Sequence, residues 1–367
     1  MDFKIDPSLK RYPFHKRDLL QAWDSADELI LEHLGGLPGL SGQRILILND
    51  NFGALSCGLE GLDITAYTDS YVSAQGIRLN SGERLQPLHR LQDLQGPYDL
   101  ALIRIPKNMS FFEDQLCHLS GHLRPSAPVI CGYMVKHQAN SSFDLLTRLI
   151  GDTRTSLARK KARLIFAELK RPATSSPYPL QIPIESFDLP FVNPSNLFSR
   201  EKLDIGTRFL LEHIPSGDFS SILDLGCGNG ILGIAAKNHH PRARLLFSDE
   251  SQMAVASART NFEAYFPEES QAPGAAEFHW THCFEEGKPD SLDLVLCNPP
   301  FHQGNTQGDF ITMQMFRDSH RTLRSGGLIR VVGNSHLQHA IPLKRIFGNS
   351  RIVAQNTKFT IVDARKE

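Results

Sequence analysis

Residues 220–237 read SSILDLGCGNGILGIAAK, in which an apolar run is followed by alternating glycines and then by a second apolar run. The first run predicts a buried strand and the second predicts a helix. Closely spaced glycines between a strand and a helix let the backbone turn sharply and approach a ligand at the helix N-terminus. The stretch therefore predicts the first strand, a ligand-binding turn and the first helix of an α/β domain.

The segments that follow continue this alternation. Residues 243–251, ARLLFSDES, predict a strand that ends on an acid, and a helix is expected from about 252 to 263. Residues 292–301, LDLVLCNPPF, predict a third strand, and a helix near 309–323 leads into the strand LIRVVG at 328–333. Strands that alternate with helices predict right-handed βαβ units and a parallel sheet covered on both faces.

The first half of the chain repeats this order of elements in a weaker form. RILILNDNFGALSCGL at 44–59 matches the strand, turn and helix described above, and YDLALIRIPK at 98–107 matches the third strand. Of the three glycines in the turn only Gly53 has a counterpart here, and Arg104 stands where the second half has Asn298. We therefore predict two doubly wound, Rossmann-like α/β domains from an internal duplication, with a degenerate N-terminal copy.

The composition is that of an ordinary globular protein of 367 residues, with 41% hydrophobic and 22% charged residues and a net charge of −1. A proline-rich stretch at 172–194 predicts a linker, so we expect domains at 1–174 and 175–367. No apolar run approaches 18 residues and the first residues include no apolar segment typical of a signal peptide, so we expect a chain that neither spans a membrane nor is secreted. The six cysteines are scattered and form no CxxC pair, which argues against a structural zinc site or a disulfide framework and suits a reducing cytosol. We expect a monomeric cytoplasmic protein.

Two acids accompany the glycine turn. Asp224 precedes the glycines, and Asp249 ends the next strand, nineteen residues after Gly230. A carboxylate at that place can accept hydrogen bonds from both ribose hydroxyls of an adenosine. The G-x-G-x-G spacing differs from the G-x-G-x-x-G fingerprint of nicotinamide cofactors, and an acid ahead of the glycines suits an ammonium better than a pyrophosphate. These residues favour S-adenosylmethionine over a nicotinamide cofactor; the alternative is a tight turn without a ligand.

The third predicted strand ends on Asn298, Pro299, Pro300 and Phe301. Neither proline nitrogen can donate to a ladder, so the strand stops at the edge of the sheet where ligands of open α/β sheets bind. The Asn298 amide oxygen and a backbone carbonyl would hold the two N–H groups of a planar amine, and Phe301 would stack on a base. The alternative is a turn that ends the strand, with Phe301 in the core.

These motifs resemble the S-adenosylmethionine-dependent amino-group methyltransferases, whose motif is Asn-Pro-Pro-aromatic. Members with a final tyrosine tend to modify adenine N6 or protein glutamine, and those with phenylalanine include guanine-N2 enzymes. Through LQAWDSADELIL, RKKARLIF, NLFSREKLDIGTRFLL and KRIFGN, nearly the whole chain resembles the RlmG/RsmC family of ribosomal RNA guanine-N2 methyltransferases. The resemblance implies methylation of a guanine N2 amine in 23S ribosomal RNA. The alternatives are adenine-N6 or glutamine methylation, or a non-catalytic cofactor-binding RNA scaffold.

The resemblance also implies roles for individual residues. The residues implied to be catalytic are Asn298, Pro299, Pro300 and Phe301. The residues implied to bind the cofactor are Asp224, Gly226, Cys227, Gly228, Asn229, Gly230, Asp249, Glu250 and Cys283. Many relatives have Asp or Asn where Cys283 stands, beside the adenine. Residues 198–206 are expected either to close over the cofactor or simply to begin a capped helix.

A basic run lies near the end of the first domain. Residues 154–171 hold seven basic side chains against one acid, Glu168. Four of the seven lie close together: Arg159, Lys160, Lys161 and Arg163. We expect two to four of these to contact RNA phosphates. The alternative is a solvated charged face.

Overall fold

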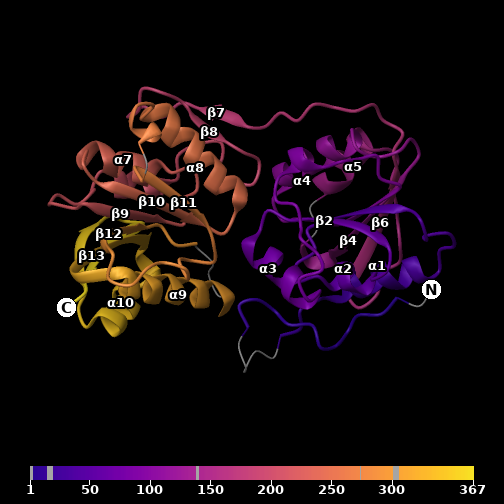
Figure 1. The fold of residues 1–367 in the computed structure, drawn as a ribbon, viewed down its shortest axis with the longest axis horizontal. Helices are drawn as coiled ribbons and strands as arrows, with labels where there is room; N and C mark the ends of the chain where they lie inside the picture. The colour runs from indigo at the N-terminus through magenta and orange to yellow at the C-terminus, as the bar shows by residue number, and fades with distance from the viewer. Residues whose placement is uncertain (1–2, 15–19, 138–139, 273, 301–305) are drawn as a thin grey trace. The chain divides into compact units, whose positions relative to one another are not determined.

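The computed structural model describes residues 3–14, 20–137, 140–272, 274–300 and 306–367 (Figure 1). The chain divides into two compact units, Met1–Tyr178 and Pro179–Glu367. The division lies within the proline-rich stretch, four residues after the boundary expected from the sequence. Each unit is an α/β domain with its own sheet.

In the described part of the C-terminal unit, seven strands form one sheet in the order β11-β10-β9-β12-β13-β15-β14. The strands are β9 (Ser221–Leu225), β10 (Arg244–Asp249), β11 (Ala276–Trp280), β12 (Leu292–Cys297), β13 (Leu323–Asn334), β14 (Arg351–Gln355) and β15 (Phe359–Arg365). The first five strands in this order are parallel, as the sequence predicts, but β15 runs antiparallel to both of its neighbours. The sheet is therefore mixed, because β14 and β15 form a hairpin at its edge.

Helices cover both faces of this sheet (Figure 1). They are α6 (Ile205–Leu211), α7 (Ile231–His239), α8 (Gln252–Tyr265), α9 (Thr306–Thr322) and α10 (Ala340–Phe347). The first three share one hydrophobic core with the sheet, and α9 and α10 share the other. The two central strands, β9 and β12, are buried along their whole length. Burial on both faces explains their continuous apolar sequences.

The N-terminal unit has the same plan. Its described strands are ordered β2-β1-β3-β4-β6-β5. They are β1 (Arg44–Leu48), β2 (Asp63–Tyr67), β3 (Leu100–Arg104), β4 (Pro128–Met134), β5 (Arg154–Thr155) and β6 (Ala162–Glu168). The helices are α1 (Ser25–Gly35), α2 (Ala54–Gly58), α3 (Tyr71–Asn80), α4 (Met109–Ser120) and α5 (Ser141–Leu149). Without β11, the C-terminal order is identical strand for strand, which confirms the predicted duplication.

Shorter elements complete the chain. A two-stranded ribbon of β7 (Leu180–Ile182) and β8 (Phe191–Asn193) precedes α6. Single 3₁₀ turns lie at η1 (Leu91–Asp93), η2 (Val135–His137), η3 (Glu269–Gln271) and η4 (Ser335–Leu337).

Buried side chains repeat the duplication in detail. The carboxylate of Asp99 accepts a hydrogen bond from the backbone N–H of Arg44 at 2.8 Å, and Asp293 accepts one from Ser221 at 2.9 Å. In each unit this bond joins the start of the third strand to the start of the first. The sequence pattern includes this pair of acids, and the structure explains why both copies have one.

A second repeated contact has no obvious sequence signal. The amide of Asn80, at the end of α3, donates to the carbonyl of Phe52 at 2.7 Å. Asn261, on α8, donates to the carbonyl of Asn229 at 3.0 Å. Both carbonyls belong to the turn before a helix, so each asparagine anchors the turn of its own unit.

Candidate active site of the C-terminal unit

The glycine turn joins β9 to α7. Gly226, Gly228 and Gly230 have φ angles of +73°, +53° and +81°, in the left-handed region that side-chain-bearing residues rarely adopt. A Cβ atom on Gly230 would lie 3.0 Å from Ala258, whereas one on Gly228 would meet no atom within 4 Å. The glycines therefore allow both a tight backbone path and open space above Gly228.

Asp224 lies beneath this turn. It is 1% exposed, and its Oδ2 accepts a hydrogen bond from the backbone N–H of Gly233 at 2.8 Å. Its Oδ1 is buried and has no hydrogen-bond partner among the described residues. Burial raises the pKa of Asp224 to about 8, because the charged form loses hydration that one backbone N–H replaces only in part.

Asp249 ends β10 beside the turn. Its two oxygens accept hydrogen bonds from the backbone N–H groups of Gly228 and Ser251, at 3.0 and 2.9 Å. Each oxygen retains a further lone pair, so the carboxylate can still accept from a hydroxyl. Burial raises the pKa of Asp249, and these backbone bonds oppose the shift. The neighbouring Glu250 is half-buried, and its carbonyl accepts from the indole N–H of Trp280 at 2.9 Å.

Two further residues of the turn have side-chain contacts. Cys227 is buried, and burial raises the pKa of its thiol well above the ordinary value. Asn229 donates to the side-chain oxygen of Asn193 at 3.0 Å, which ties the turn to β8. Neither residue has the character of a nucleophile, because a buried neutral thiol and an amide are both unreactive.

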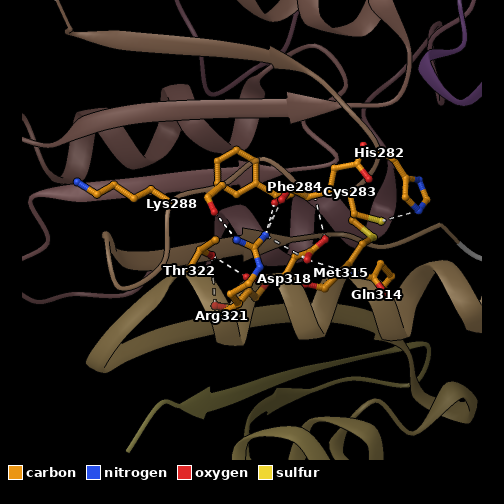
Figure 2. Close-up of polar contacts among 12 residues, drawn as sticks. His282, Cys283, Phe284, Lys288, Gln314, Met315, Asp318, Arg321 and Thr322 are labelled. Carbon is orange, nitrogen blue, oxygen red and sulfur yellow. Dashed lines mark hydrogen bonds and ion pairs between the residues drawn. The ribbon is translucent and has the colours of Figure 1, made fainter. Parts of the chain in front are cut away.

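Cys283 follows β11 and has a φ of +51° (Figure 2). Its side chain is buried, and its Sγ lies 3.8 Å from Nε2 of His282. Burial raises the pKa of this thiol far above its ordinary value, so Cys283 is a neutral thiol. The contact with His282 therefore does not create a reactive thiolate.

Helix α9 holds the turn that contains Cys283 (Figure 2). Arg321 donates to the carbonyls of Phe284 and Glu285, at 2.8 and 3.1 Å, and also to that of Gly287. Asp318 accepts from the backbone N–H of Phe284 at 3.3 Å. This clamp fixes the backbone beside Cys283.

Asn298 follows the last residue of β12. Its Nδ2 donates to Oγ1 of Thr207 at 2.8 Å and to Oδ2 of Asp204 at 3.1 Å. Its Oδ1 is buried, and no described residue hydrogen-bonds to it. Pro299 is buried and Pro300 is exposed. The amide nitrogen thus donates two hydrogen bonds, and the amide oxygen is free to accept one. Phe301 lies outside the described residues.

The sequence did not identify Asp204 and Thr207 as partners of Asn298. Asp204 is the N-cap of α6 and accepts from the backbone N–H of Thr207 at 2.8 Å. The capped helix expected at the end of 198–206 is therefore confirmed. A capping signal shows where a helix begins, but it does not show which distant strand the capping residue also contacts.

The N-terminal unit has an ion pair at the position equivalent to Asn298. Arg104, the last residue of β3, bonds to Asp24 at 2.8 Å and also to Asp27. Asp24 is the N-cap of α1, as Asp204 is of α6. Arg104 is 8% exposed, so this unit has a buried cation paired with two carboxylates where the C-terminal unit has a free amide oxygen.

The basic run lies in the turn before β6 and on the strand itself. Two of its members form ion pairs with α1, Arg159 with Glu32 and Lys160 with Glu28 at 2.8 Å. The other two differ: Lys161 is exposed, and Arg163 is half-buried. Part of the positive charge is thus neutralised within the unit.

Two features are absent from the described ranges, a metal-binding cluster and a membrane-spanning helix. No group of three or more His, Cys, Asp or Glu residues there is arranged to hold a metal ion. None of the helices in these ranges has the length and apolar character required to cross a membrane.

Comparison with known proteins places both units. The RLMG N-terminal domain model matches residues 3–171, and the methyltransferase small domain model matches residues 188–363. The ribosomal RNA large subunit methyltransferases G of Psychromonas ingrahamii and Stutzerimonas stutzeri are each 42% identical to this chain, over 98% of it and 96% of their own length. The fold is similar to that of the T. thermophilus 16S rRNA N2 methyltransferase RsmC, solved with AdoMet and guanosine. This match has a TM-score of 0.78 at 20% identity and covers 99% of this chain and 95% of that one. The chain belongs to the ribosomal RNA large subunit methyltransferase G family.

Proposed function

We propose that this protein transfers the methyl group of S-adenosylmethionine to the exocyclic N2 amine of a guanine in 23S ribosomal RNA. Its relatives are named as large-subunit ribosomal RNA methyltransferases, and the neighbour in fold is an N2 methyltransferase. The observation that carries the proposal is the Asn298 amide, whose buried oxygen has no partner in the described chain. Such an oxygen at the carboxyl end of a central strand is an acceptor for an amine N–H.

The residues around the glycine turn fit S-adenosylmethionine. The space above Gly228 admits a ligand close to the backbone, and Asp249 lies beside it with lone pairs for ribose hydroxyls. The unpartnered oxygen of Asp224 suits the ammonium of the methionine part, and Cys283 would lie beside the adenine. When bound, this cofactor supplies an electrophilic methyl group on a sulfonium.

The protein groups then have to hold and orient the amine. The nitrogen of an exocyclic amine is a weak nucleophile, because its lone pair is delocalised into the ring. The Asn298 oxygen accepts one N–H and a backbone carbonyl of the Asn-Pro-Pro segment accepts the other, which favours a pyramidal nitrogen. Removal of one such polar partner typically lowers the rate about 100- to 1000-fold. Alignment of the reacting atoms accounts for much of the remaining acceleration.

We assign RNA positioning to the N-terminal unit. Its site equivalent to Asn298 contains the guanidinium of Arg104, paired with Asp24 and Asp27, and a guanidinium cannot accept a hydrogen bond from an amine. Phosphate contacts are assigned to Lys161 and Arg163, with Arg159 and Lys160 contributing when their carboxylate partners release them. We further propose that the enzyme acts in the cytoplasm as a monomer, because both Asn298 and the glycine turn belong to one chain.

Nucleoside analysis tests this function. The full chain is incubated with methyl-labelled S-adenosylmethionine and 23S ribosomal RNA that lacks the modification, either free or in ribosomal particles. The proposal expects label in N2-methylguanosine after digestion of the RNA. Label in N6-methyladenosine or in protein glutamine would favour the alternative enzymes. Cofactor binding without any labelled product would favour a non-catalytic scaffold.

A further inference from the structure

Asn298 forms a closed set of hydrogen bonds with two polar side chains, Thr207 and Asp204. Its Nδ2 donates both to Thr207 Oγ1 at 2.8 Å and to Asp204 Oδ2 at 3.1 Å, and the Thr207 hydroxyl lies 3.3 Å from the same carboxylate oxygen. Thr207 is 8% exposed, so water does not readily replace these bonds. The amide is therefore fixed by groups that lie more than 90 residues away in the chain.

The partners determine which end of the amide faces away from them. A carboxylate can only accept hydrogen bonds, so the atom of Asn298 that faces Asp204 must be the nitrogen. The Thr207 hydroxyl donates toward Asp204, which leaves its lone pairs to accept from the same nitrogen. The amide oxygen consequently points to the other side, where it is buried and has no partner among the residues described.

The same partners also change the charge on that oxygen. Hydrogen bonds in a chain polarise one another, and an amide that donates to a carboxylate carries more negative charge on its oxygen. A more negative oxygen binds the N–H of an amine more strongly as positive charge develops on the amine nitrogen.

Asp204 is closely packed against neighbouring groups. A Cβ on Gly206 would lie 3.0 Å from Oδ2 of Asp204 and 3.0 Å from the ring of Phe359. A side chain at position 206 would thus press on both the Asp204 carboxylate and the ring of Phe359, on β15. In the N-terminal unit the capping acid Asp24 likewise bonds to the end of the third strand, although its partner there is Arg104.

We infer that Thr207 and Asp204 are positioning residues that set the orientation and polarity of the Asn298 amide for methyl transfer. The inference rests on the proposed function, because it concerns the same amine. Neither residue is required to contact the base or the cofactor. Their effect on the rate passes through Asn298, and this route can be measured.

The experiment is a double-mutant cycle on the full chain under single-turnover conditions. Thr207→Val keeps the shape of the side chain and removes the acceptor, whereas Thr207→Ser keeps the hydroxyl. The expected results are an about 10- to 100-fold lower rate for Thr207→Val and a rate within about threefold of wild type for Thr207→Ser. In the Asn298→Ala background, Thr207→Val should change the residual rate by less than about twofold. The Kd for S-adenosylmethionine and the KM for RNA should stay within about threefold.

Several results would overturn the inference. A wild-type rate for Thr207→Val excludes the role, and so does an equal loss of rate in both backgrounds, which indicates an independent structural effect. If Thr207→Val fails to fold, Asp204→Asn replaces it, because asparagine caps a helix as well as aspartate and its single oxygen can take the place of Oδ2, while the charge and the second acceptor oxygen are lost. That variant should be about tenfold slower than wild type, and an unchanged rate contradicts the inference. A wild-type enzyme that forms no N2-methylguanosine refutes the proposed function itself.

Discussion

Asp224 lies in the centre of the C-terminal sheet with one carboxylate oxygen satisfied and the other unpartnered among the described residues. Asp249, at the end of the neighbouring strand, has both oxygens bonded to backbone N–H groups. Two acids of the same motif thus have different environments. The first has its pKa raised to about 8, so the protonation of Asp224 changes with pH in the neutral range.

The raised pKa predicts a pH dependence of stability for the ligand-free protein. The folded state binds a proton at Asp224 up to about pH 8, whereas the unfolded chain releases it near pH 3.8. The contribution of this residue to stability is therefore full below about pH 4 and is lost as pH rises toward 8, by at most about 1.4 kcal/mol per pH unit. Asp224→Asn should remove this dependence. Denaturant unfolding of both proteins at pH 5 and pH 8 measures it, and identical pH slopes would contradict the prediction.

Asp249 predicts an effect on cofactor affinity. Asp249→Ala removes the proposed ribose acceptor and should weaken S-adenosylmethionine binding by about 1.5–3 kcal/mol, the range for hydrogen bonds to charged groups. The substitution also frees the N–H of Gly228, so part of the loss comes from the turn. Calorimetry measures the affinity for S-adenosylmethionine. Asp249→Asn keeps an acceptor oxygen without the charge, so it shows how much of the loss is due to the charge. An unchanged Kd in Asp249→Ala would mean that the ribose is bound elsewhere.

At the scale of elements, α9 connects two parts of the site. It begins at Thr306, after the Asn-Pro-Pro motif, and its last turns clamp the loop beside Cys283 through Asp318 and Arg321 (Figure 2). The order of strands and helices was predictable from hydrophobic periodicity and glycine turns. The clamp was not, because Arg321 bonds to carbonyl groups, which leave no mark on the sequence. The hairpin of β14 and β15 was not predicted either, because LIRVVG was the last strand expected from the sequence.

The clamp predicts that Arg321 supports cofactor binding indirectly. Arg321→Ala removes the side-chain donor to the Glu285 carbonyl and one of two donors to the Phe284 carbonyl, which still accepts from the backbone N–H of Gly287. An unsatisfied buried group costs about 1–3 kcal/mol. The variant should unfold at lower temperature and should bind S-adenosylmethionine several-fold more weakly. Arg317→Ala, an exposed site on the same helix, is the matched control and should change neither property. Equal affinities in the two variants would show that the loop does not need the clamp.

At the scale of the whole molecule, the same strand order, apart from β11, occurs in both units, but the equivalent position is Asn298 in one and Arg104 in the other. The sequence showed the duplication because strands, turns and the acids Asp99 and Asp293 recur at matching places. It did not show that Asn80 and Asn261 anchor the turns, because an amide can hydrogen-bond to the backbone carbonyl of any residue type. The pairing of Asn298 with Asp204 was equally hidden, since it joins residues 94 positions apart.

The proposed assignment of RNA binding to the N-terminal unit and of cofactor binding to the C-terminal unit predicts that the two can be impaired separately. Replacement of the four basic residues of the run by glutamine, in the full chain, should flatten the slope of log K against log salt by about 1.4–2.8, since each phosphate contact on single-stranded RNA contributes about 0.7. Affinity for S-adenosylmethionine should be unchanged. The replaced residues are Arg159, Lys160, Lys161 and Arg163. An unchanged salt slope would identify the run as a solvated face.

The ion pairs with α1 allow a complementary test of the same surface. Glu28→Gln together with Glu32→Gln releases Lys160 and Arg159 from their partners, so RNA affinity at low salt should rise. Surface ion pairs contribute only about 0–1 kcal/mol each, so the fold should tolerate both changes. Filter binding at several salt concentrations measures the effect. Unchanged or weaker binding would argue that phosphates do not reach this part of the unit.

The most direct test of the whole account is the single-turnover rate of Asn298→Ala, measured with S-adenosylmethionine and 23S ribosomal RNA. The account predicts that the formation of N2-methylguanosine falls about 100- to 1000-fold, because the variant loses the acceptor for the amine. Cofactor affinity, measured by calorimetry on the same preparation, should stay within about threefold of wild type, since the amide faces the base. A variant that methylates guanine N2 at a near wild-type rate would contradict the central claim.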